Sequence, residues 1–155
     1  MKRINWGIIG LGNIANSLSK SFEKSDSFQL KGIASKNSQN LKNFKKNINI
    51  ENLFCFDNYE DLIKSSEIDI IYIALPNSHH YEWINKCIDH NKHVLVEKPI
   101  TENFFQLETI KNKLLEKNSK ILIFEGFMYK YHPQINKILD LINNNEIGEI
   151  KKIIS

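Results

Sequence analysis

A glycine turn near the N-terminus constrains this chain more than any other feature. The apolar run Ile4–Ile9 leads directly into Gly10–Ala15, which has the pattern Gly-x-Gly-x-x-Ala. Behind the turn, Ile14, Leu18 and Phe22 recur every four residues, which predicts a helix with one buried face. A strand, this turn and a helix, in that order, form the Rossmann fingerprint of dinucleotide-binding domains. A glycine turn between two ordinary elements is the plainer alternative.

Each small residue of the turn has a defined role in the fingerprint. Gly10 permits the tight turn, Gly12 lets the backbone approach a pyrophosphate, and Ala15 lets the helix pack against the sheet. The N–H groups and the dipole at the helix start, near Asn13 and Ile14, favour a phosphate charge. We therefore expect Gly10, Gly12, Asn13 and Ile14 to bind a dinucleotide.

The composition is that of a soluble globular protein. The 155 residues suffice for one domain, 41% are hydrophobic, and the net charge is only +3. The lysines are spread out rather than gathered in a basic stripe, which argues against a nucleic-acid partner. Apolar runs such as Ile70–Leu75 are strand-sized, and no signal peptide follows Met1, so we expect no membrane association.

The cysteine and histidine residues give no sign of a metal site. Cys55 and Cys87 are isolated, which is typical of buried, reduced thiols in a cytoplasmic protein. His90 and His93 are spaced like a metal-binding pair, but no third ligand completes a site. A turn followed by a strand explains the pair better, so we expect no metal.

Strand and helix signals alternate along the chain with short connections. This alternation predicts an α/β fold, a parallel doubly wound sheet with helices on both faces. The expected strands are residues 4–9, 28–34, 53–56, 68–75, 93–97 and 120–125, with helices beginning near residues 13, 41, 59, 78, 101 and 133. We also expect a strand at Ile150–Ile154, for which the remaining sequence supplies no partner.

Four motifs occur in order along the chain: Gly10–Ala15, Ala34–Lys36, Leu75–His80 and Glu97–Pro99. Together they resemble the Gfo/Idh/MocA family of oxidoreductases. A further segment, Glu125–Pro133, resembles the crossover into that family's second domain. The resemblance spans essentially the whole chain, although family members are usually much longer. It implies a Rossmann NAD(P)-binding domain over residues 1–125, and a crossover with the start of a truncated α+β substrate domain over residues 126–155.

The resemblance places Ser35 and Lys36 at the adenosine ribose and any 2′-phosphate of the cofactor. No Asp or Glu occurs between Lys31 and Asn40, so no carboxylate repels a 2′-phosphate there. We therefore expect NADP, with NAD possible because Lys36 lacks the bidentate fork of the family's usual arginine. A solvated surface lysine is the alternative interpretation of Lys36.

The resemblance also assigns residues near the nicotinamide. Leu75, Pro76 and Asn77 follow the fourth expected strand and run along the cofactor, and His80 occupies the family's histidine position. Helix capping or a surface location are the alternatives for His80. Lys130 stands where the family often has an arginine that contacts the cofactor.

Lys98 is the candidate catalytic residue. Similar proteins place this lysine beside the nicotinamide and the substrate hydroxyl, where Glu97 and Pro99 fix the backbone. A lysine so placed can orient or relay a proton. The alternative is a strand-end lysine whose amine simply extends into water. We also expect Glu97 and Lys98 to line the cofactor site.

The resemblance implies an NAD(P)-dependent oxidoreductase that acts on a sugar, a cyclitol or a related hydroxyl or carbonyl substrate. The full-length form is expected to be a homo-oligomer. The family's second acid/base lies in the half that is missing here, so the isolated chain is not expected to show full activity. The alternative is a non-catalytic dinucleotide-binding module or a truncated remnant.

Overall fold

The computed structural model describes residues 3–154. Six strands form one sheet in the order β3-β2-β1-β4-β5-β6, and every neighbouring pair is parallel. The strands are β1 (Ile4–Ile9), β2 (Phe28–Ala34), β3 (Phe54–Phe56), β4 (Ile70–Ile73), β5 (His93–Val96) and β6 (Ile123–Glu125). The helices are α1 (Asn13–Phe22), α2 (Ser38–Lys46), α3 (Tyr59–Lys64), α4 (His80–Asp89), α5 (Phe104–Glu116) and α6 (Pro133–Asn143). The doubly wound parallel sheet expected from the sequence is confirmed.

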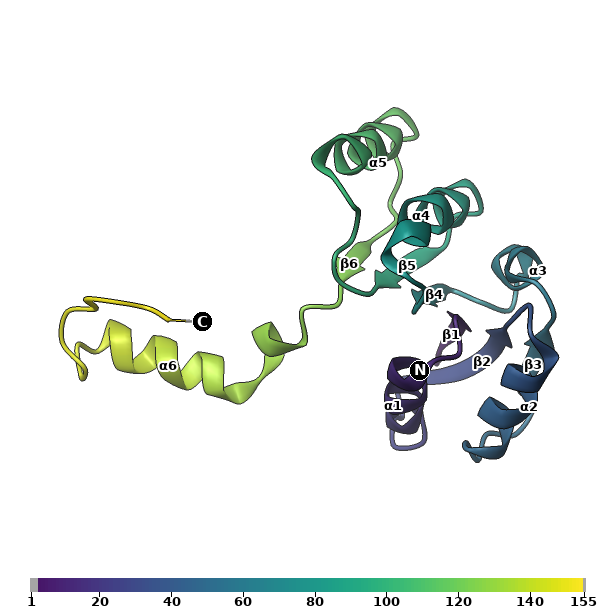
Figure 1. The fold of residues 1–155 in the computed structure, drawn as a ribbon, viewed down its shortest axis with the longest axis horizontal. Helices are drawn as coiled ribbons and strands as arrows, with labels where there is room; N and C mark the ends of the chain where they lie inside the picture. The colour runs from purple at the N-terminus through teal and green to yellow at the C-terminus, as the bar shows by residue number, and fades with distance from the viewer. Residues whose placement is uncertain (1–2, 155) are drawn as a thin grey trace.

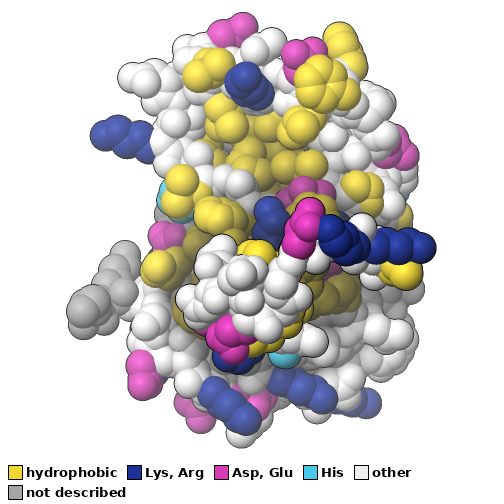
Figure 2. All heavy atoms as spheres, turned by 90° about the vertical axis from the view of Figure 1, so that its left-hand side faces the viewer, with side chains coloured by type: hydrophobic (Ala, Val, Ile, Leu, Met, Phe, Trp, Pro, Cys, Tyr) yellow, Lys and Arg dark blue, Asp and Glu magenta, His cyan; other side chains and the backbone are white. Residues whose placement is uncertain are grey.

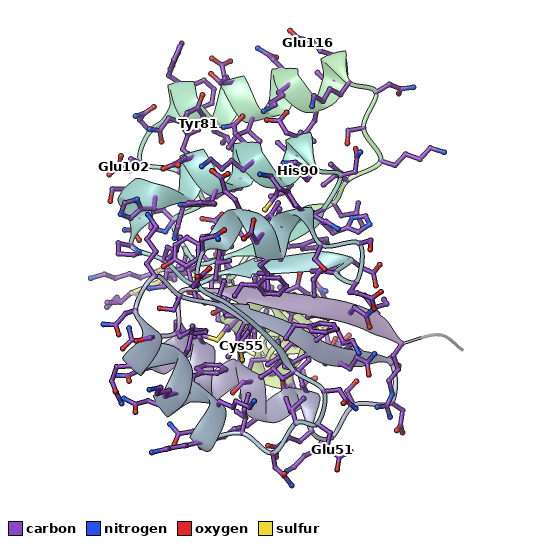
Figure 3. All side chains as sticks on the ribbon, turned by 90° about the vertical axis from the view of Figure 1, so that its right-hand side faces the viewer. Glu51, Cys55, Tyr81, His90, Glu102 and Glu116 are labelled. Atoms are coloured by element: carbon purple, nitrogen blue, oxygen red, sulfur yellow. The ribbon has the colours of Figure 1, made fainter. Side chains whose placement is uncertain are left out.

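The sheet lies between two layers of helices. Figure 3 shows α4 and α5 on one side of it, with Tyr81 and Glu116 labelled, and α1 and α2 on the other. Two hydrophobic clusters fill these layers, one that includes Ile71 and Ile84 and one that includes Ile8 and Ile33. Strands covered on both faces explain the nearly continuous apolar runs in the sequence.

Asparagine side chains set the start of three helices. The carboxamide of Asn37 accepts hydrogen bonds at the start of α2, and Asn58 does the same for α3. Asn103 accepts the N–H of Gln106, so α5 begins at Phe104. The expected start at Thr101 was therefore wrong by three residues, because Asn103 supplies the cap.

The buried face of α1 differs from the expected one. Ala15, Ser19 and Phe22 are buried, whereas Ile14 is 38% exposed. The face that carries the small residues Ala15 and Ser19 packs against the sheet, and Ile14 lies outside that face. The expectation that Ile14 belongs to the buried face was therefore wrong.

Two further expectations are contradicted at the margins of the sheet. Residues 150–154 form no strand and are exposed, because a strand needs a hydrogen-bonding partner and the described part of the chain offers none to this segment. Cys55 is exposed rather than buried, since β3 is a short strand at the edge of the sheet; Cys87 is buried. Figure 1 shows α6 and the residues after it projecting away from the sheet. None of the helices within residues 3–154 is both long enough and apolar enough to cross a membrane.

Candidate functional site

The sheet brings the sequence motifs together at one edge. Ile9 at the end of β1 is aligned with Ala34 of β2 and with Ile73 of β4, and Ile73 is aligned with Val96 of β5. The residues that follow these positions therefore share the carboxyl edge of the sheet. In open α/β sheets this edge is where ligands bind, at the point where the strand order reverses.

Gly10 makes the turn after β1 possible. Its φ of +86° lies in the left-handed region that favours glycine. A Cβ atom at this position would lie 2.4 Å from the carbonyl oxygen of Ala74, an impossible contact with backbone. The turn therefore requires glycine here whatever binds nearby.

Gly12 has a different role, because a Cβ atom there would meet nothing within 4 Å. The residue is the N-cap of α1, and no side chain caps this helix. The first N–H groups of a helix lack acceptors inside it, and the helix dipole is positive at this end. The open space beside Gly12, with exposed Asn13 and Ile14, thus fits an anionic group such as a pyrophosphate.

Ser35 and Lys36 follow β2 on the same edge. Ser35 is 5% exposed, and its Oγ accepts a hydrogen bond of 3.1 Å from the N–H of Asn37. Lys36 is exposed, with its Nζ 5.8 Å from the centre of the Tyr59 ring. The structure thus offers an exposed cation at the strand end, beside a serine whose hydroxyl accepts a hydrogen bond within the loop.

The segment after β4 places its residues in two environments. Pro76 and Asn77 are exposed, and Leu75 is half-buried. The His80 ring is fully buried and contacts two backbone oxygens, Pro99 O at 2.7 Å from Nδ1 and Leu75 O at 2.9 Å from Nε2. Neither helix capping nor a surface location describes this side chain, and the structure does not bring it to the surface with the other candidates.

The segment after β5 is held on both sides of Lys98. The Tyr72 hydroxyl donates a hydrogen bond of 2.5 Å to Oε1 of Glu97, and the Ile100 N–H donates one of 2.8 Å to Oε1 of Glu125. Burial, together with the nearby Glu97 carboxylate, raises the pKa of Tyr72 far above its ordinary value, so its hydroxyl stays a donor. Lys98 itself is exposed, and no carboxylate in the described residues pairs with it.

Tyr72 and Glu125 were missed as site residues from the sequence. The signal for Tyr72 was a hydroxyl within an otherwise apolar strand, and the signal for Glu125 was a carboxylate at the end of β6. Both are buried or half-buried, and buried polar groups generally have hydrogen-bond partners. Their partners could not be identified without the alignment of β4, β5 and β6.

An apolar groove of about 1300 Å³ lies on one face of the sheet and extends from Ile14 of α1 across β4 and β5 to Phe124 and Met128. It runs along the sheet face that α4 and α5 leave uncovered. Figure 2 shows hydrophobic side chains gathered on the side of the molecule from which the C-terminal segment projects. Lys130 lies in the 3-10 helix Met128–Tyr131; it is exposed, with its Nζ 5.8 Å from the centre of the Phe127 ring.

The His90 and His93 pair forms no site. The Nδ1 atom of His93 accepts the N–H of Leu122 at 3.0 Å, a contact that ties β5 to the segment before β6. Within residues 3–154, no three His, Cys, Asp or Glu side chains lie close enough together to hold a metal ion.

Residues 4–126 match a family model described as "Oxidoreductase family, NAD-binding Rossmann fold". The chain belongs to the GFO_IDH_MocA family. The match covers the whole sheet and ends just after β6. The resemblance and the fold expected from the four motifs are thereby confirmed.

Two curated relatives illustrate the similarity. A dTDP-3,4-didehydro-2,6-dideoxy-alpha-D-glucose 3-reductase from Actinomadura kijaniata is 31% identical over 149 residues, which are 96% of this chain and 43% of the relative. A glucose-6-phosphate 3-dehydrogenase from Bacillus subtilis is 32% identical over 153 residues, 99% of this chain and 41% of the relative. The chain thus spans less than half the length of these relatives.

Solved structures of similar proteins support the same family assignment. A 3-ketoreductase from Actinomadura kijaniata, crystallised with NADP, superposes with a TM-score of 0.87 at 30% identity, covering 97% of this chain and 47% of that one. An apo scyllo-inositol dehydrogenase from Lactobacillus casei gives a TM-score of 0.84 at 25% identity, covering 96% and 44%. The relatives are NAD(P)-dependent oxidoreductases of sugars and related rings, and this chain corresponds to their nucleotide-binding half.

Proposed function

We propose that this chain is the dinucleotide-binding half of an NADP-dependent oxidoreductase whose substrate is a sugar, a cyclitol or a related ring alcohol or ketone. The observation that carries the proposal is the uncapped start of α1 beside Gly12, where an added Cβ atom would find open space. The family match and the NADP-bound structural neighbour support the same cofactor.

Residues at different strand ends bind different parts of the cofactor. The N–H groups of Asn13 and Ile14 bind the pyrophosphate, while Gly10 and Gly12 give it access to the backbone. Ser35 and Lys36 bind the 2′-phosphate. The remaining cofactor-binding residues lie along the nicotinamide half: Leu75, Pro76, Asn77, Glu97, Lys98 and Lys130. When bound, the nicotinamide supplies the hydride acceptor or donor.

Lys98 is the residue that handles the proton. Its amine is exposed at the end of β5 and has no carboxylate partner among residues 3–154, so it is available to the oxygen of a substrate. In an enzyme that carries both halves, Lys98→Ala should lower kcat by about 10²–10⁴-fold, the usual contribution of a positioned proton carrier. NADPH affinity should stay within about threefold of the wild type, since most cofactor contacts lie elsewhere. A variant that keeps its kcat would remove Lys98 from the chemistry.

The names of the relatives support a sugar ring as substrate, since two of them act at position 3 of a glucose derivative. We place the domain boundary at residues 125 and 126, with 126–155 as the crossover into a substrate domain. We further propose a cytoplasmic protein without nucleic-acid or membrane partners, whose longer form is a homo-oligomer.

A second candidate function is a dinucleotide-binding module without turnover. It is favoured by the family match, which covers an NAD-binding Rossmann domain over residues 4–126. The two candidates share the cofactor site and differ in catalysis. Robust dehydrogenase activity from the 155-residue chain alone would exclude the module.

A fluorescence titration with NADPH and with NADH tests the cofactor site that both candidate functions share. A charged hydrogen bond contributes about 1.5–3 kcal/mol, so we expect NADPH to bind about ten- to a hundredfold more tightly. Lys36→Ala should remove most of this preference, whereas Lys45→Ala, at the far end of α2, should keep it. Equal affinities in the wild type, or a preference that survives Lys36→Ala, would contradict the assignment.

A further inference from the structure

The His80 ring joins two loops that are far apart in the sequence. It is 0% exposed at the first position of α4, and both ring nitrogens lie within hydrogen-bond distance of backbone oxygens. Nδ1 is 2.7 Å from Pro99 O in the loop after β5, and Nε2 is 2.9 Å from Leu75 O in the loop after β4. Both partners are carbonyl oxygens, which accept, so the neutral ring donates a hydrogen bond to one of them and only the doubly protonated ring donates to both.

The two loops belong to neighbouring parallel strands. Ile73 at the end of β4 is aligned with Val96 at the end of β5, and the N–H of Glu97 donates to Ile73 O at 3.1 Å. The sheet ladder ends there, so the backbone beyond it needs other partners. His80 places one ring nitrogen against a carbonyl oxygen of each loop, just past the last ladder bond.

Lys98 lies in the part of the chain that these contacts hold. Tyr72 holds Glu97, the residue before it, and Glu125 holds the N–H of Ile100, two residues after it. His80 holds the carbonyl oxygen of Pro99 between them. The exposed Lys98 side chain thus lies on a loop whose backbone is contacted by side chains of α4 and β6, and the neighbouring Glu97 side chain is held by Tyr72 of β4.

We propose that His80 is a positioning residue rather than a cofactor ligand: it fixes the Lys98 loop against the Leu75–Asn77 loop, and thereby sets the nicotinamide half of the site. We call the two contacts of His80, with Pro99 O and with Leu75 O, the clamp. The clamp itself is inferred from these contacts alone, whereas the identity of the ligand rests on the proposed function. Tyr72 and Glu125 act on the same loop from its two ends. Positioned groups of this kind need a supporting shell of buried contacts to hold their geometry.

Amide hydrogen exchange in the cofactor-free chain tests the clamp directly. His80→Ala should speed exchange at Glu97 and Ile100 by about tenfold relative to a core amide such as Ile8. Ile84→Ala, a fully buried change on the same helix, should lower global stability without altering that ratio. Unchanged relative exchange at Glu97 and Ile100 in His80→Ala would overturn the proposal.

Two conservative variants separate the two contacts and keep the test valid if the alanine variant does not fold. An asparagine at position 80 carries an N–H near the place of Nδ1, so His80→Asn should keep the Pro99 contact and nearly wild-type exchange at Ile100. A glutamine carries its N–H near the place of Nε2, so His80→Gln should keep only the Leu75 contact and exchange faster at Ile100. Equal exchange at Ile100 in the two variants would contradict a clamp on Pro99.

Ligand binding then tests the link to the site. The probes are NADPH and 2′,5′-ADP, which lacks the nicotinamide half. His80→Ala should weaken NADPH binding about tenfold and leave 2′,5′-ADP binding within twofold, whereas Ile84→Ala should not change the ratio of the two affinities. If His80→Ala leaves the ratio of NADPH affinity to 2′,5′-ADP affinity unchanged, the positioning role is overturned. If the wild type binds neither probe, the proposed function fails, and the exchange experiment alone decides on the clamp.

Discussion

Residues 4–126 and residues 127–154 bury their apolar side chains to very different degrees. Ile8, Ile71 and Ile84 in the first region are fully buried. In the second region no described residue is buried, and Ile138 and Leu139 of the amphipathic helix α6 are 41% and 49% exposed. The first region supplies its own core, whereas the second presents an apolar helix face that no segment within residues 3–154 covers.

The helix α6 forms even though its apolar face is not buried. The start of α6 is fixed locally, because Pro133 occupies the first turn and the Nδ1 of His132 accepts the N–H of Gln134. Such a helix needs no tertiary partner to be recognised in the sequence. A strand at 150–154 needs a neighbouring strand to pair with. For this reason the helix expected from residue 133 is confirmed, whereas the strand expected at 150–154 is wrong.

The largest expected effects are within the glycine turn of the first region. Gly10→Val should prevent stable folding, because the Cβ atom collides with Ala74 O and the φ angle is unfavourable for valine. Gly12→Val should keep the fold, since the space beside it is open, but lose NADPH binding. Circular dichroism with NADPH titration measures both. A folded Gly12→Val chain that still binds NADPH would reduce the glycine loop to a turn.

Replacing an apolar side chain by alanine should lower the free energy of unfolding much more in the first region than in the second. Ile71→Ala removes a fully buried side chain from β4 and should lower the free energy of unfolding by about 2–5 kcal/mol. Leu139→Ala on α6 should change it by less than about 0.5 kcal/mol, because this side chain has no core to leave. Urea denaturation of the two variants compares them. A large loss from Leu139→Ala would show that α6 packs on the domain in solution.

A smaller effect is expected from the ion pairs between α4 and α5. Asp89 lies 2.8 Å from Nζ of Lys113 and 2.6 Å from Nζ of Lys117, and hydrogen bonds to these amines lower the pKa of the Asp89 carboxyl. Because the folded pKa is depressed, the contribution is present above the unfolded value of about 4 and is lost as the pH falls through the folded value.

We therefore expect Asp89→Asn to cost at most about 1 kcal/mol at pH 7, a bound that allows for solvent screening of this exposed pair. The difference from the wild type should shrink as the pH falls below about 4. Glu149→Gln, which removes the ion pair with Lys151 in the second region, serves as the matched control and should have no measurable effect. A pH-independent cost in Asp89→Asn would point to packing instead of charge.

The sequence predicted the sheet, the glycine turn and the motif order because each depends on local pattern. Apolar runs mark parallel strands, and the left-handed turn at Gly10 requires a residue without a side chain. What escaped prediction depends on contacts between distant segments. The burial of His80 and the hydrogen bond from Tyr72 to Glu97 become visible only when β4 and β5 are aligned. The exposure of Cys55 follows from the place of β3 at the sheet edge.

The most direct test of the account is a ¹H–¹⁵N NMR titration of the 155-residue chain with NADPH. We expect the amide shifts to concentrate at residues 10–14, 35–36, 75, 77 and 97–98, with a further change at Lys130. Signals from residues 134–154 should not move, since this segment takes no part in binding the cofactor. Shifts centred on α6, or no shifts at saturating NADPH, would contradict the claim that the strand ends of the first region form the cofactor site.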